Sequence, residues 1–153
     1  MKRIGDKALT FRLPAMMDGG LNFLDPDEFL GQWVVLSFVL ALGEFDSALW
    51  NEQGKEMESL GATLLVVPWE AKMLHGGQLN PPYKEHFTIV GDPLRRLQRL
   101  YGNPTLLSSG RARTFLVDPD GRLRFHVLHS LSERGMGVVM ELLQTYQTEE
   151  IPA

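Results

Sequence analysis

The residues that could carry chemistry in this chain are few, and none of them is a cysteine. Without cysteine the protein forms no disulfide, thiolate metal site or Fe–S cluster, and any mechanism with a sulfur nucleophile is excluded. Ser47, at the start of an expected helix, is a candidate nucleophile, but a serine hydroxyl needs an adjacent base. A hydrolase of this kind therefore requires a histidine within hydrogen-bond reach of Ser47.

The four histidines form two pairs along the sequence. His126 and His129 are three positions apart in an expected strand, so their side chains point to opposite faces and do not share a metal. His75 and His86 flank a loop rich in glycine and proline, and they converge on a ligand only if that loop folds back. We expect no metal site and no cofactor.

Charged residues suggest a further class of site. Glu52 and Glu56 share one side of an expected helix, which is typical of a solvated face. Positive charge gathers in the second half of the chain and suits a bound anion or an acidic partner, although exposed helix and hairpin faces explain most of it. The arginines concerned are Arg95, Arg96, Arg99, Arg111, Arg113, Arg122 and Arg124.

Composition limits the partners and the location of the protein. The net charge is −4 over 153 residues, so we expect no nucleic-acid binding. No apolar run reaches the roughly 20 residues of a membrane helix, and no apolar stretch follows the basic amino terminus as in a secretory signal. We therefore expect a cytoplasmic protein that does not bind membranes.

Hydrophobic periodicity predicts the elements that position these residues. Apolar runs at 33–40 and 62–69 are typical of strands buried on both faces. Between them a helix from Asp46 to Gly61 is expected to turn Phe45, Leu49, Gln53, Met57 and Leu60 inward. A strand, a helix and a strand in this order predict a parallel pair with a right-handed crossover.

Turn signals and apolar spacing predict the remaining elements. The last helix is expected to bury Val138, Val139, Leu142, Leu143 and Tyr146, and Met136 is expected near a turn. The other expected elements are a strand ending at Pro14, a helical turn behind Asp25, helices near 70–74 and 94–100, a strand at 87–90, a hairpin of 114–117 with 123–128, and a helix over 132–146.

These elements predict an α/β protein with a thioredoxin-like fold. A central mixed sheet, made of the βαβ unit and a C-terminal β-hairpin, is flanked by helices. We expect one domain over residues 4–147 and a frayed tail over 148–153.

Five motifs follow one another along the chain: Ile4–Pro14, Leu30–Phe38, Leu60–Ala62, Asp92–Pro93 with Tyr101–Gly102, and Thr114–Gly121. In this order they resemble the peroxiredoxin (AhpC/TSA) family. The resemblance implies a thioredoxin-like fold and, in the family, antioxidant peroxidase activity by a reactive cysteine.

The active-site loop departs from the family pattern Pro-x-x-x-Thr-x-x-Cys. Counted from Phe38, Ser47 stands at the position of the peroxide-attacking cysteine, Glu44 at that of the threonine and Leu40 at that of the proline. Counted back from the Leu-Gly pair that ends the helix, the cysteine position falls on Gly43. Either way no sulfur is present.

The arginine that lowers the thiol pKa in the family is also displaced. Its position holds Ala112, with Arg111 and Arg113 on either side. Because nucleophile, threonine, proline and arginine are lost together, we expect no thiol-peroxidase activity.

Two functions compete with the hydrolase hypothesis. The first is a redox-inactive binding or assembly module, which could form a homodimer through the vestigial active-site face with Phe45, Leu49 and Trp50 as apolar contacts. The alternative is an antioxidant oxidoreductase that relies on a partner chain or a bound cofactor for its redox chemistry.

Overall fold

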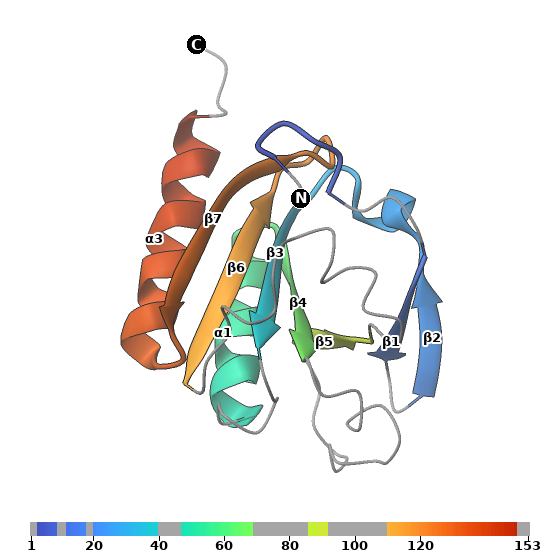
Figure 1. Ribbon diagram of the computed structural model, residues 1–153, viewed down its shortest axis with the longest axis horizontal. Helices are drawn as coiled ribbons and strands as arrows, with labels where there is room; N and C mark the ends of the chain where they lie inside the picture. Colours follow the sequence, from blue (N-terminus) through green and yellow to red (C-terminus); the bar gives the residue numbers. More distant parts are fainter. Residues whose placement is uncertain are drawn as a thin grey trace.

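The computed structural model describes residues 3–8, 12–17, 20–39, 47–68, 86–91 and 110–149 (Figure 1). The helices expected near 70–74 and 94–100 lie outside these residues. The described elements are β1 (Leu13–Met17), β2 (Gly20–Leu24), the 3-10 helix η1 (Pro26–Phe29), β3 (Trp33–Val39), α1 (Ser47–Ser59), β4 (Ala62–Pro68), β5 (Phe87–Val90), β6 (Arg111–Val117), β7 (Leu123–Ser130) and α3 (Glu133–Glu149).

The strands form one sheet of seven in the order β2-β1-β5-β4-β3-β6-β7, and Figure 1 shows α3 beside the β7 edge. β3 pairs in parallel with β4, and β4 in parallel with β5. The remaining neighbours are antiparallel, including the β6–β7 hairpin. The predicted βαβ unit, C-terminal hairpin and mixed thioredoxin-like sheet are confirmed.

Two hydrophobic clusters pack against opposite faces of the sheet. One contains Val35 and Val39 of β3 together with residues of α1 and α3, and we call it the helix-side core. The other contains Val34, Leu36 and Phe38 with residues of β1, β2 and β6, and we call it the hairpin-side core. All seven residues of β3 are buried because alternate side chains enter the two cores.

The amino-terminal hairpin differs from the expectation. Pro14 does not end the strand but lies inside β1, and residues 20–24 form a partner strand that the sequence did not indicate. Proline is tolerated here because its carbonyl, and not an N–H, makes the bond to the neighbouring strand: it accepts from the Gly91 N–H at 2.8 Å.

Burial confirms most of the two expected helix faces and corrects single positions. In α3, Val138 is 42% exposed, whereas Met136, expected near a turn, is fully buried beside Val139 and Leu143. In α1, Met57 is buried and Leu49 and Leu60 pack against the core as expected, but Trp50 is fully buried as well. α3 continues to Glu149, three residues beyond its expected end.

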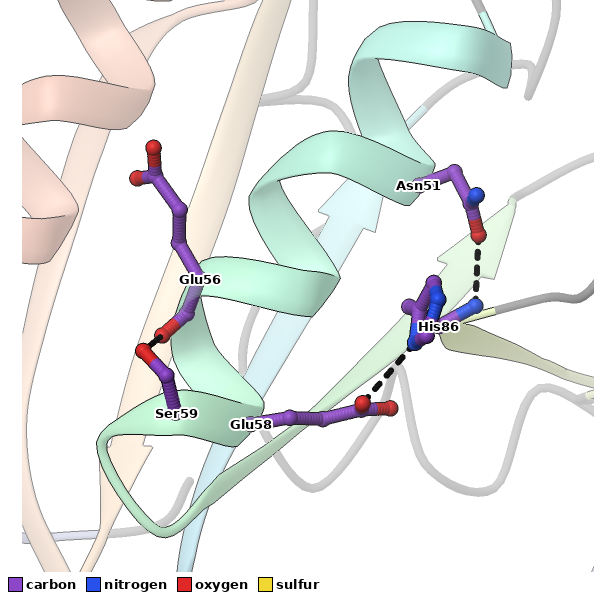
Figure 2. A network of polar contacts seen from close by, with 5 residues as sticks. All are labelled: Asn51, Glu56, Glu58, Ser59 and His86. Carbon is purple, nitrogen blue, oxygen red and sulfur yellow. Dashed lines mark hydrogen bonds and ion pairs between the residues drawn. The ribbon is translucent and has the colours of Figure 1, made fainter.

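Helix α1 approaches β5 closely at Gly54. A Cβ atom added there would lie 2.0 Å from the His86 carbonyl oxygen. Figure 2 shows His86 between two side chains of α1: its backbone N–H donates to Asn51 Oδ1 at 2.5 Å, and its Nδ1 lies 2.8 Å from Glu58 Oε2. The absence of a side chain at Gly54 therefore permits the contact that joins α1 to β5.

We predict that Gly54→Ala destabilises the protein by about 2 kcal/mol or more, although alanine favours helices over glycine by about 1 kcal/mol. The added methyl must displace the backbone of β5. Urea unfolding measures the effect, and Gly137→Ala in α3 is the matched control because nothing lies within 4 Å of its Cβ position. The control should be neutral or more stable than the wild type, and equal effects of the two substitutions would contradict the account.

Candidate functional site

The expected site lies between the end of β3 at Val39 and the first residue of α1, Ser47. Glu44, Phe45 and the Ser47 side chain lie outside what the structure describes. The strand before the expected site, the helix after it and strand β6 alongside are described.

No arginine of β6 points toward the side of the sheet that α1 covers. Ala112, which the sequence resemblance predicts at the arginine position, pairs with Val39, is fully buried and belongs to the helix-side core. Its neighbours alternate to the other side. Arg111 is exposed, and the Arg113 guanidinium lies 5.7 Å from the centroid of the Phe115 ring, which belongs to the hairpin-side core. Arg111 and Arg113 therefore do not place a guanidinium group beside Ala112 on the helix side.

A buried chain of polar groups crosses three strands on the helix side instead. Ser37 Oγ of β3 lies 2.8 Å from Thr114 Oγ1 of β6, and Thr114 Oγ1 lies 2.6 Å from His129 Nε2 of β7. Ser37 and Thr114 are fully buried and His129 is 5% exposed. Buried polar groups are tolerated when they are hydrogen-bonded, as these are.

The direction of this chain follows from its last member. His129 Nδ1 lies 2.9 Å from the Ser130 carbonyl oxygen, which can only accept, so Nδ1 carries the proton of the neutral ring. Nε2 must then accept from the Thr114 hydroxyl, and Thr114 in turn accepts from Ser37. As long as His129 stays neutral, Ser37 donates to Thr114 and Thr114 donates to His129.

Burial lowers the pKa of His129, and the hydrogen bond to the Ser130 carbonyl only partly offsets that effect. His126 lies on the other side of β7, with its ring centroid 5.3 Å from that of Phe115. Its pKa is lowered by burial and by the nearby Arg113. The prediction that these two histidines point to opposite faces is confirmed.

No group of three or more histidine, aspartate and glutamate side chains in the described part of the chain could hold a metal ion. His75 lies outside that part, so its convergence with His86 remains untested.

The described histidines do not favour a hydrolase centred on Ser47. His86 bonds to Glu58, near the opposite end of α1 from Ser47, about 16 Å away at about 1.5 Å per helical residue. His129 uses Nε2, the nitrogen that a base would offer, for the Thr114 hydroxyl.

One of the expected interface residues belongs to the core. Trp50 is fully buried, with its ring centroid 6.2 Å from that of Phe87, so it cannot supply the surface contact expected of it. The reason is the helical phase: the buried stripe of α1 runs through Trp50, Gly54 and Met57. Leu49 is half-buried against the same core.

Two of the described arginines of the second half contact their own chain. Arg122 donates to the Gly5 carbonyl at 2.9 Å, and Arg124 lies 3.7 Å from Asp118. Arg95, Arg96 and Arg99 lie outside the described residues. Glu52 and Glu56 are exposed, as expected of a solvated face.

Comparison with known proteins now identifies the scaffold. No family model matches the chain. It is 26% identical over 157 residues to Peroxiredoxin-2 of Pongo abelii, covering 95% of this chain and 89% of that protein. It is 25% identical to Peroxiredoxin TSA1 of Saccharomyces cerevisiae, covering 95% and 80%. By sequence this chain is similar to peroxiredoxins.

The fold of this peroxiredoxin-like chain also matches solved structures. Mycobacterium bovis AhpC superposes with a TM-score of 0.74 and 22% identity, covering 100% of this chain and 97% of that one.

None of the described helices combines the length and the apolar character needed to cross a bilayer.

Sequence reasoning missed the Ser37–Thr114–His129 chain. Two signals were available: Ser37 interrupts an otherwise apolar strand, and Thr114 precedes the apolar run of β6 at a position that alternation directs inward. Neither signal indicates which residue forms the hydrogen bond, because Ser37 and Thr114 are 77 positions apart in the sequence.

We predict that protein stability falls as the pH drops below about 6.5, the ordinary pKa of histidine. Because the pKa of His129 is lower in the folded protein, the unfolded chain binds more protons at this residue as the pH falls. The contribution of neutral His129 to the free energy of unfolding is therefore fully present above about pH 6.5, and it decreases as the pH falls from there to the pKa of the folded state. One group contributes a slope of at most about 1.4 kcal/mol per pH unit. Urea unfolding between pH 8 and 5 measures it.

His129→Gln should flatten this pH dependence. His126→Gln should retain the larger part of it, because His126, whose pKa is also lowered, is far less buried than His129. An unchanged slope in His129→Gln would show that this histidine does not control the acid sensitivity.

Proposed function

We propose that this peroxiredoxin-like chain is a redox-inactive binding or assembly module. The observation that carries the proposal is the complete absence of cysteine from a chain that is similar in sequence to peroxiredoxins and in fold to AhpC. The expected cytoplasmic location belongs to the same proposal.

The chemistry of the family explains why this absence is decisive. A thiolate with a lowered pKa attacks the O–O bond of a peroxide and becomes a sulfenic acid. A serine hydroxyl stays protonated at neutral pH without a base, and its oxygen cannot cycle through a sulfenate or a disulfide. Ala112, buried at the arginine position, supplies no positive charge to an anionic nucleophile.

We predict no steady consumption of hydrogen peroxide above a protein-free blank when the purified chain is supplied with a dithiol or with thioredoxin and its reductase. Peroxiredoxin TSA1 of Saccharomyces cerevisiae, assayed in parallel, provides the positive control. Sustained turnover, or a visible chromophore that accompanies it, would instead support the alternative of an oxidoreductase that depends on a partner or a cofactor.

Assembly through the vestigial active-site face is the second part of the proposal. With Trp50 in the core, the surface contact rests on Phe45 and on the half-buried Leu49. Apolar anchors near the centre of an interface carry most of its binding energy.

We predict that light scattering detects a homodimer and that Phe45→Glu weakens its association at least about tenfold, since a buried unpaired charge costs more than 1.4 kcal/mol. Val138→Glu, which places the same charge on the exposed side of α3, is the matched control and should leave the dimer intact. A wild-type monomer at high concentration, or equal effects of the two variants, would refute this interface.

A further inference from the structure

A hollow of about 260 Å³ lies at the end of the sheet where β3 begins and β6 ends. Phe29, Val34 and Val117, which belong to or pack against the hairpin-side core, give it an apolar lining. Leu30 lines it as well and is 55% exposed. Figure 1 shows η1 and the β6–β7 turn at this end, away from the end of β3 that leads to α1.

Backbone hydrogen bonds hold the walls of the hollow together. The Gly31 N–H, just after η1, donates to the Pro119 carbonyl of the β6–β7 turn at 2.8 Å, and the Ala8 N–H donates to the Gly121 carbonyl at 2.9 Å. Within the turn, Asp118 Oδ1 accepts the N–H groups of Asp120 and Arg122 at 3.0 Å each. The site is therefore preformed, which lowers the entropic cost of binding.

The charges around this hollow favour a cation. Its lining residues include Asp27, Asp118 and Asp120 against a single base, Lys7. Asp118 is occupied by the turn and by Arg124, 3.7 Å away. The exposed carboxylates of Asp27 and Asp120 have no side-chain ion pair or hydrogen bond within the described residues. The carboxylates of Asp27 and Asp120, which have no side-chain partner among the described residues, therefore flank an apolar hollow.

These observations distinguish an organic cation from a metal ion. No group of three acidic or histidine side chains in the described ranges is arranged to hold a metal, and the apolar lining offers nothing to a hydrated ion. The volume lies just below the about 300 Å³ at which sites for drug-sized ligands begin, so the ligand is small.

We infer that this hollow binds a small organic ammonium ion with its apolar group against Phe29, Val34 and Val117 and its charge between Asp27 and Asp120. The site is separate from the vestigial redox centre: Val34 and Val39 lie at opposite ends of β3, about 17 Å apart at about 3.3 Å per residue. Its function does not depend on whether the chain reduces peroxide.

The test uses three probes of one shape on the full chain: phenethylammonium, neutral 2-phenylethanol and anionic 3-phenylpropionate. Amide chemical shifts in nitrogen-15 NMR spectra report binding at Val34, Val117 and Gly121. We expect saturable shifts there with a Kd of about 1 mM for the ammonium probe, as suits so small a ligand. Its affinity should exceed that of the alcohol at least about fivefold and that of the carboxylate by more.

Charge variants separate recognition from general attraction to an acidic protein. Asp27→Asn combined with Asp120→Asn should reduce the affinity for phenethylammonium to that for the alcohol. Glu52→Gln combined with Glu141→Gln, which removes two exposed charges elsewhere, should leave the affinity unchanged.

Three outcomes would overturn the inference: no saturable shifts at the hollow, equal affinity in the two double variants, or tightest binding of the carboxylate. The last would show that Lys7 and not the aspartates determines which ligand binds. None of these results bears on peroxide turnover, so failure here is distinct from failure of the proposed function.

Discussion

Strand β3 is buried along all seven of its residues, and it separates the two hydrophobic cores. Its parallel partner β4 and antiparallel partner β6 depend on its register, because every residue from Val34 to Val39 is paired on both sides. Helix α1 packs on one face of this central group. A strand constrained on both faces and both edges fixes where its carboxyl end lies, and the site expected from the sequence follows that end.

The scaffold and the chemistry are therefore separable in this molecule. Burial of β3 requires apolar side chains on two faces but does not require a thiol beyond its end. The helix side carries the buried Ala112, and a buried Ser37–Thr114–His129 chain lies two residues before that end. Fold similarity to AhpC does not by itself imply the activity of AhpC.

Much of the fold could be predicted because its signals are local. The apolar runs of β3 and β4 and the cap at Gly61, with φ 74°, were all indicated by neighbouring residues. Pro14 and Trp50 were misplaced for a different reason. The location of Pro14 depends on which group of β1 faces β5, and that of Trp50 on the angle at which α1 meets the sheet. The Ser37–Thr114–His129 chain joins three strands, so only the sheet order reveals it.

The central claim is that the scaffold persists while the environment that activates a thiol is gone. The most direct measurement is the thiol pKa of Ser47→Cys, obtained from the pH dependence of its alkylation rate. Because Ser47 begins α1, the helix N-terminus alone lowers a thiol pKa there; the account predicts a value above about 7, without the further lowering that a nearby arginine supplies, and no saturable reaction with peroxide. A pKa below about 6 together with rapid, saturable peroxide reduction would show that the activating environment survives, and would contradict the claim.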